Sequence, residues 1–161
     1  MVTTLTRTVT EGADIRAAVL DALAAIPDPE LPMVGIVDLG MVHAVTVDGA
    51  TIRVEVLPTF IGCPALDLIG ASIRDGLAGF GREVVVEPTF AVPWTTDRIT
   101  PAGRAALTRA GIAAPDDPAA VRCPLCGSDR VAMDSVFGPT QCRSLFYCRA
   151  CRQPFEAMKP V

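Results

Sequence analysis

Apolar residues recur at helical spacing in two segments of the chain, residues 13–26 and 64–80. Residues three and four positions apart lie on one face of a helix, so each segment would present an apolar stripe to a core. The first helix is predicted to begin near residues 10–12 and to end before Pro27. The second is predicted to begin at Pro64, because a missing N–H group costs little in the first turn. The apolar positions are Ile15, Val19, Leu20, Leu23 and Ile26 in the first segment, and Leu66, Ile69, Ile73, Leu77 and Phe80 in the second.

A β-hairpin is predicted between these two helices. Residues 41–47 and 51–56 are rich in β-branched side chains, and Asp48-Gly49 between them is a typical two-residue turn. The second strand alternates, with Ile52, Val54 and Val56 expected inward and Arg53 and Glu55 outward. A third strand is predicted at residues 82–90.

A last helix is expected at residues 101–110, with Thr100 as its N-terminal cap and Gly111 as its C-terminal stop. The predicted fold class is therefore α/β: a small α-β-β-α-β sandwich with one sheet face covered, followed by a C-terminal four-cysteine ribbon. Residues 27–40 contain three prolines and two glycines between the first helix and the hairpin, and they predict an irregular segment.

The expected domains are an α/β domain at residues 10–112 and a cysteine module at residues 122–161. Residues 113–121 are short of large apolar side chains and rich in proline, which indicates a linker. The module is too small to build a sufficient core of its own, so a bound metal ion is expected to stabilise it.

The module contains two Cys-x-x-Cys turns, Cys123/Cys126 and Cys148/Cys151. Two such turns complete a tetrahedral four-thiolate site, which favours structural zinc, although four thiolates also hold iron or an iron–sulfur cluster. Cys142 is left outside this tetrahedron. It is interpreted either as a small buried hydrophobic side chain or as an additional thiol near the metal.

A sixth cysteine, Cys63, is expected at the N-cap of the second helix, where the helix dipole and free amides favour a thiolate. Gly62 would allow the sharp turn that exposes its sulfur. The single histidine, His43, falls within a predicted strand, where it is more often a packing residue than a catalytic base.

The segment "DPELP" places Asp28 and Glu30 beside two prolines. These acids could cap a helix, accept hydrogen bonds from the Cys63 loop or act on a metal, and capping is the simplest reading. Asp38 is interpreted in the same way.

Charge and composition argue against several classes of protein. Residues 1–121 carry a net charge of −7 and residues 122–161 carry +3, so the acidic body disfavours nucleic-acid binding. No apolar run is long enough for a transmembrane helix, and the N-terminus lacks the pattern of a secretory signal. A cytoplasmic protein is therefore expected, in which six cysteines favour metal or thiol chemistry over disulfides.

The chain resembles a known family in two segments, "IPDPELPMVGIVDLGMV" and "PTFIGCPALDLIGASIRDGL". They are similar to the small domain shared by iron–sulfur cluster assembly factors of the SufT type. The segments "VPWTTDRITPAGRAALTRAGIAAP" and "VRCPLCGSDRVAMDSVFGPTQCRSLFYCRACRQPFEAMKP" resemble the PaaD (or PaaJ) family, encoded with the phenylacetyl-CoA epoxidase system.

The resemblance implies an accessory protein that is not itself catalytic and that helps to mature an iron–sulfur or diiron centre in the oxygenase and reductase subunits. It implies that Cys63, Asp28 and Glu30 form the assembly site, that the two Cys-x-x-Cys turns bind the metal, and that Cys142 belongs to a family motif. A purely structural adaptor of the oxygenase complex is the alternative. A homodimer through the hairpin's edge strand is also open.

Overall fold

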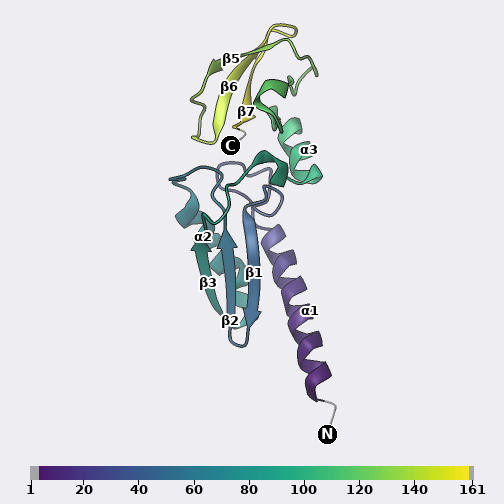
Figure 1. Ribbon diagram of the computed structural model, residues 1–161, viewed down its shortest axis with the longest axis vertical. Helices are drawn as coiled ribbons and strands as arrows, with labels where there is room; N and C mark the ends of the chain where they lie inside the picture. Colours follow the sequence, from purple (N-terminus) through teal and green to yellow (C-terminus); the bar gives the residue numbers. More distant parts are fainter. Residues whose placement is uncertain (1–3, 160–161) are drawn as a thin grey trace.

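The computed structural model describes residues 4–159, which form an α/β domain followed by a β-ribbon (Figure 1). The α/β domain contains α1 (Thr4–Ala24), β1 (Val42–Asp48), β2 (Thr51–Val56), α2 (Leu66–Leu77), β3 (Glu83–Pro88) and α3 (Pro101–Arg109). The ribbon sheet contains β4 (Ile112–Ala113), β5 (Val131–Ser135), β6 (Arg143–Cys148) and β7 (Pro154–Met158). This is the predicted fold class. In the described part of the chain, no helix has the length and apolarity needed to cross a membrane.

The first sheet has the order β1-β2-β3, with β1 antiparallel and β3 parallel to β2. The hairpin is confirmed, but its turn is shifted by one residue. Asp48 pairs with Thr51, so the turn consists of Gly49 and Ala50 instead of Asp48 and Gly49. Gly49 has a φ of 49°, a left-handed conformation that a glycine adopts without steric cost.

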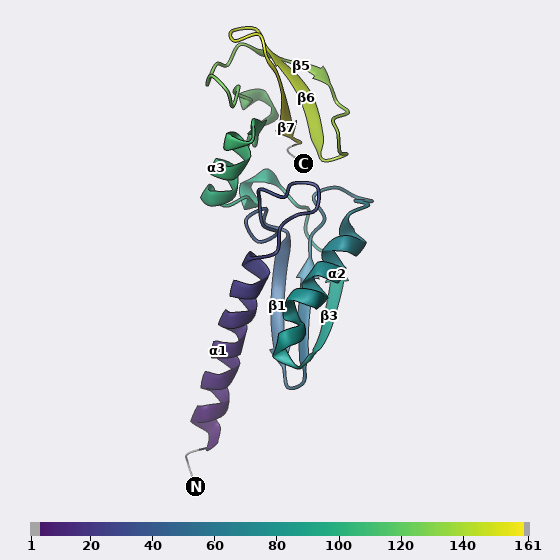
Figure 2. The same cartoon turned by 180° about the vertical axis from the view of Figure 1, so that it is seen from behind.

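One face of this sheet is covered, as predicted. Helix α2 lies against it between β2 and β3, and α1 contacts both α2 and β1 (Figure 2). Ile52, Val54 and Val56 are fully buried beneath the helices. On the open face Arg53 and Glu87 form an exposed ion pair, with 2.6 Å between nitrogen and oxygen. Such a pair contributes little stability, so the sheet is held by its buried face.

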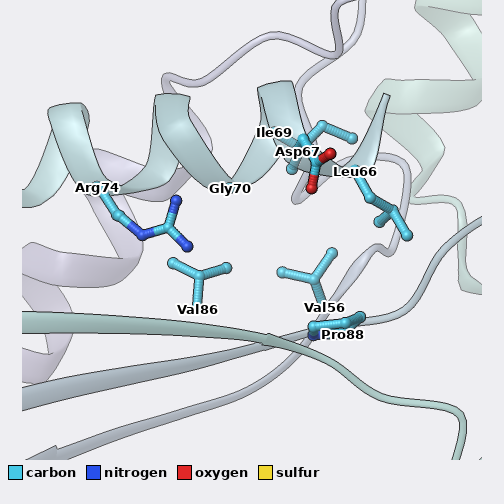
Figure 3. A pocket seen from close by; sticks show the side chains of 8 residues that line it. All are labelled: Val56, Leu66, Asp67, Ile69, Gly70, Arg74, Val86 and Pro88. Atoms are coloured by element: carbon cyan, nitrogen blue, oxygen red, sulfur yellow. The ribbon is translucent and has the colours of Figure 1, made fainter. Parts of the chain in front are cut away.

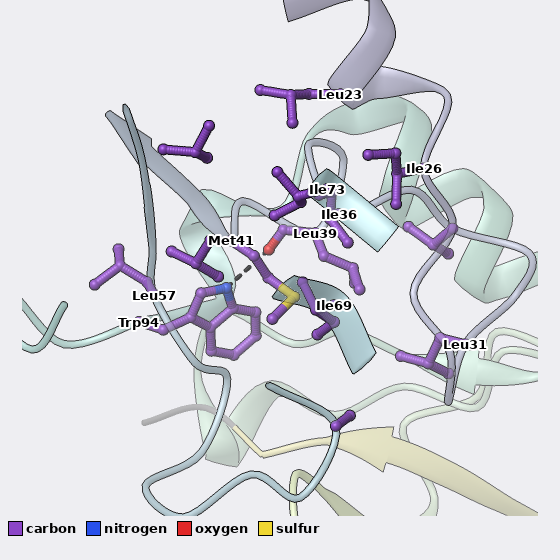
Figure 4. Close-up of a cluster of buried hydrophobic side chains, with 14 of the residues drawn as sticks. Leu23, Ile26, Leu31, Ile36, Leu39, Met41, Leu57, Ile69, Ile73 and Trp94 are labelled. Carbon is purple, nitrogen blue, oxygen red and sulfur yellow. Dashed lines mark hydrogen bonds between the residues drawn. The ribbon is translucent and has the colours of Figure 1, made fainter. Parts of the chain in front are cut away.

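The proline-rich segment 27–41 is irregular, as predicted, yet it lies in the core (Figure 4). Ile36, Leu39 and Met41 have no exposed surface, and the indole N–H of Trp94 donates to the backbone oxygen of Leu39 at 2.8 Å. The backbone of this segment is therefore satisfied by neighbouring elements instead of by a regular ladder.

Helix α1 begins at Thr4, so the predicted start near residues 10–12 is wrong. Residues that often cap helices do not by themselves start one. A single threonine or glycine inside a helix lowers its stability by at most about 1 kcal/mol relative to alanine, so the helix can continue through it. The end before Pro27 is confirmed. In α3, the Thr100 hydroxyl accepts the N–H of Gly103, and Gly111 has a φ of 79°, so both predicted helix ends are confirmed.

The sequence missed two strands of the ribbon, β4 and β7. Both are short, and β4 pairs in parallel with β7, more than 40 residues away in the chain. The segment that the sequence predicts as a linker thus starts inside a strand, and Arg104 of α3 donates to the backbone oxygen of Ala114 and pairs with Asp116. The predicted limits of the two domains stay a prediction. The limit at residue 161 lies outside the described residues.

Candidate metal centre and junction thiols

The four cysteines of the two Cys-x-x-Cys turns converge, with all four sulfurs within 4.8 Å of one another. The Sγ atoms of Cys123 and Cys151 are 3.7 Å apart, and those of Cys126 and Cys148 are 3.6 Å apart. A tetrahedral ion with metal–sulfur bonds of about 2.3 Å would place its sulfurs about 3.8 Å from each other. The four side chains therefore fit a four-thiolate metal site.

The two turns have the same backbone geometry. The residue after the second cysteine is left-handed in each, Gly127 with a φ of 73° and Arg152 with a φ of 61°. The N–H of Gly127 donates to the oxygen of Cys123, and the N–H of Arg152 to the oxygen of Cys148. Such turns direct amides at the sulfurs, and the N–H of Cys151 is the main reason why the pKa of Cys148 is lowered to about 6. A thiolate, the form that binds metal, is thereby favoured at Cys148 at neutral pH, whereas burial raises the pKa of Cys151 to about 12, so that thiol would lose its proton only when an ion binds.

Cys142 lies at the opposite end of β6 from this cluster. It is six positions before Cys148 in the sequence, which corresponds to about 20 Å along an extended strand. In Figure 1 the turn after β6 is the far tip of the ribbon, whereas the start of β6 faces the α/β domain. Cys142 is buried and packs into the same hydrophobic cluster as the α/β core. It is therefore not a fifth ligand of the four-cysteine cluster.

Cys63 lies in the loop between β2 and α2, on the side of the α/β domain that faces the ribbon. Gly62 before it has a φ of 79°, which confirms the predicted sharp turn. The N-cap of α2 is Ala65, so the prediction that Cys63 caps the helix is wrong; Pro64 and Ala65 add a turn before the first helical residue. Cys63 is half-buried and packs against the α/β core.

The predicted thiolate character of Cys63 is also corrected. Burial raises the pKa of Cys63, and the N–H of Ala65 opposes this only in part. Coulombic interactions with Glu30, Cys142 and Asp28 raise the pKa of Cys63 further. The sequence suggested that a helix N-terminus alone sets the pKa of Cys63, whereas in the folded chain two acids and a second cysteine also influence it.

The acidic loop is held by Asp28 itself. Its carboxylate is buried and accepts the N–H groups of Glu30 at 2.9 Å and Leu31 at 2.8 Å. Burial raises the pKa of Asp28, while these two hydrogen bonds and the nearby Arg143 lower it. Asp28 thus shapes the loop that carries Glu30 towards Cys63.

Asp38 and His43 lie apart from this loop. The Thr100 hydroxyl donates to Asp38 at 2.5 Å, which joins its loop to the start of α3. His43 is the extra residue of a β-bulge between Val42 and Ala44, and its Nδ1 atom is buried without a hydrogen-bond partner. The bulge is a local feature that strand periodicity alone does not predict.

Two pockets flank the α/β sheet, and neither is lined by cysteine. The first, of about 90 Å³, lies between α2 and the strands, with Arg74 and Asp67 at its edges and Val86 at its base (Figure 3). The second, of about 240 Å³, is mainly apolar and is lined by Phe60, Phe90 and neighbouring residues of the loops after β2 and β3. Cys63 and Cys142 therefore do not line either of these two pockets.

The raised pKa of Cys63 predicts a pH dependence for its alkylation. Iodoacetamide attacks the thiolate, so the rate at Cys63 should be low at pH 7 and should still rise above about pH 8.5, where an unperturbed thiol is half ionised. Glu30→Gln removes a negative charge and should move the curve to lower pH, whereas Glu55→Gln on the open sheet face should not. The measurement is mass-spectrometric mapping of the labelled peptide, and a plateau below pH 8 would contradict the prediction.

Family comparisons agree with this two-part architecture. Residues 16–88 match the family described as "Iron-sulfur cluster assembly protein", and residues 108–159 match the "PaaD zinc beta ribbon domain". A crystal structure of the domain of unknown function DUF59 from Bacillus anthracis superimposes with a TM-score of 0.58 and 28% identity, over 62% of this chain and 96% of that one. The chain thus combines an assembly-type α/β domain with a four-cysteine zinc ribbon.

A curated relative narrows the assignment. A protein of Escherichia coli (strain K12), provisionally named as one of the subunits of 1,2-phenylacetyl-CoA epoxidase, is 39% identical over 147 residues, which are 86% of this chain and 89% of the relative. The chain belongs to the PaaD family.

Proposed function

We propose that this chain is an accessory maturation factor of the phenylacetyl-CoA epoxidase system. It assists the assembly of an iron–sulfur or diiron centre in the oxygenase and reductase subunits, acts in the cytoplasm and does not itself perform the epoxidation. The name of the Escherichia coli relative and the match to an iron–sulfur cluster assembly family support this proposal.

The observation that carries the proposal is the position of Cys63. Cys63 is a half-buried thiol at the junction of two domains, and Asp28 and Glu30 lie near enough for their charges to raise its pKa. Thiolate sulfur and carboxylate oxygen are both donors that iron accepts. Its raised pKa keeps the empty thiol protonated, so that binding a cation, which favours the thiolate, is coupled to loss of a proton. Asp28 would shape the loop and Glu30 would face the cargo.

The ribbon would hold one structural zinc ion. Cys123, Cys126, Cys148 and Cys151 would be its ligands, and the ion would supply folding stability without reacting. The ribbon would also dock the client protein. Metal analysis with an absorption spectrum of the anaerobically purified protein tests this: one zinc per chain without a visible band is expected, and iron with charge-transfer bands would overturn it.

The decisive test of the assembly role is Cys63→Ser in cells that produce the epoxidase and reductase subunits. Because serine is a poor ligand for iron, the iron content of both subunits should fall at least about tenfold under iron limitation. The wild-type chain supplied in trans should restore it, and Ala71→Ser on the exposed surface of α2 is the matched control. Full metallation at normal rates with Cys63→Ser would contradict the assembly role.

A structural adaptor is the second candidate. The side chains of Ile61 and Phe137 are each 81% exposed, which is unusual for large apolar residues and suits a protein-binding surface. An adaptor predicts stoichiometric co-purification with the oxygenase components and indifference to Cys63→Ser. The same experiment therefore separates the two functions.

A further inference from the structure

Cys63 and Cys142 belong to different domains but share one hydrophobic cluster at the domain junction. Cys142 is a buried member of the main hydrophobic cluster, and Cys63 packs against that same cluster. Both views of the chain place the end of the ribbon that contains the start of β6 over the loops of the α/β domain (Figures 1 and 2). Neither cysteine is part of the four-sulfur cluster.

One residue joins the two cysteine loops. The N–H of Lys159 donates to the backbone oxygen of Cys142 at 2.8 Å, and its Nζ lies 5.5 Å from the centre of the Phe60 ring and 5.8 Å from that of Phe137. The backbone oxygen of Phe60 in turn accepts the N–H of Cys63 at 3.1 Å. Cation–π contacts to both rings thus hold the two loops against each other.

Polar and charged groups lie near Cys142. The Thr140 hydroxyl is 3.2 Å from the sulfur of Cys142. Arg143, next to Cys142, is buried, pairs with Glu156 and acts on Asp28 across the junction. Coulombic interaction with Cys142 is also one of the causes that raise the pKa of Cys63, so the two thiols lie within electrostatic range of each other.

We propose that Cys63 and Cys142 form a single two-thiol site that binds a soft metal ion through both sulfurs, one supplied by each domain. Each thiol loses its proton when the ion binds, and no electron is transferred. The ion's positive charge would offset the repulsion that two thiolates would feel from each other and from Asp28 and Glu30, a repulsion that the empty site avoids because Cys63 stays protonated. This two-thiol site deepens the proposed function. It rests on that function only for the identity of the bound ion, which would be iron in transit.

Two sulfurs on separate domains explain why the ribbon is fused to the assembly domain. A single thiolate binds soft ions weakly, whereas a second donor held nearby raises affinity by about 10²–10⁴ through effective concentration. The zinc ion at the far end of β6 would stabilise the strand that presents Cys142. The ribbon would then complete the site instead of only docking a client.

Phenylarsine oxide tests the pairing directly on the full-length, zinc-loaded protein. Its arsenic exchanges one oxygen for the sulfurs of two thiols, whose protons leave with that oxygen as one water molecule, with no change of oxidation state. One arsenical per chain is expected with zinc retained, and peptide mapping should find the Cys63 and Cys142 peptides bridged by arsenic. Each of three variants, Cys63→Ser, Cys142→Ser and the double variant, should weaken arsenical binding by the same factor, at least about 100-fold. The effects of the two substitutions on affinity are not additive, because the two sulfurs act as one site.

Zinc content and the fluorescence of Trp94 establish that each variant is folded. If Cys142→Ser does not fold, the bridged peptide in the wild-type protein still decides the question. Unchanged arsenical binding in either folded single variant, or a bridge between other cysteines, would overturn the proposal. Normal metallation of the client subunits with Cys63→Ser would contradict the assembly role but would not affect the arsenical result. The two failures are therefore distinguishable.

Discussion

Cys148→Ser is expected to abolish zinc binding and to unfold the ribbon while the α/β domain stays folded. Cys148 is fully buried, and its sulfur lies 3.6 Å from that of Cys126 inside the cluster. Structural zinc contributes about 10–16 kcal/mol in small domains, more than the core around the stacked Phe146 and Phe155 rings is expected to supply. Zinc stoichiometry should fall from one per chain to below about 0.1, with amides of residues 122–159 exchanging rapidly in hydrogen-exchange experiments.

Cys142→Ser is the matched control for this experiment. It makes the same chemical change on the same strand, but at the end that lies about 20 Å from the cluster. It should leave one zinc per chain and an ordered ribbon. Equal zinc loss in both variants would show that the metal is not held by the four clustered cysteines.

Leu39→Ala is expected to lower the free energy of unfolding of the α/β domain by about 2–5 kcal/mol. Substitutions in irregular segments are usually tolerated, but Leu39 has no exposed surface and its backbone oxygen accepts the Trp94 indole hydrogen. The truncation would leave a cavity beside the indole (Figure 4). Denaturant unfolding followed by the fluorescence of Trp94, the only tryptophan in the chain, measures this effect.

Leu68→Ala is the control for this second prediction. Leu68 lies on α2 and is 61% exposed, so the same truncation should change the free energy of unfolding by less than about 0.5 kcal/mol. A similar decrease in the free energy of unfolding for both variants would mean that burial in segment 27–41 does not contribute to the stability of the domain.

Local signals in the sequence identified much of the candidate site, and the reason is the spacing of its residues. Cys148 and Cys151 are three residues apart, so a single turn can direct both sulfurs at one ion. Gly62 and Pro64 mark the turn at Cys63 because each has a strong backbone preference. The thiolate character of Cys63 was predicted wrongly, since burial and neighbouring charges depend on residues far away in the chain.

The sequence by itself determined the elements with a strong period or a strong turn: the amphipathic helices, the hairpin strands and the two Cys-x-x-Cys turns. These depend on interactions between residues a few positions apart. Only the tertiary structure decided that the irregular segment 27–41 is core, that β4 pairs with β7, and that Cys142 belongs to the hydrophobic cluster against which Cys63, 79 residues earlier in the chain, also packs. Such contacts arise from burial and packing between distant segments, which leave no periodic signal in the chain.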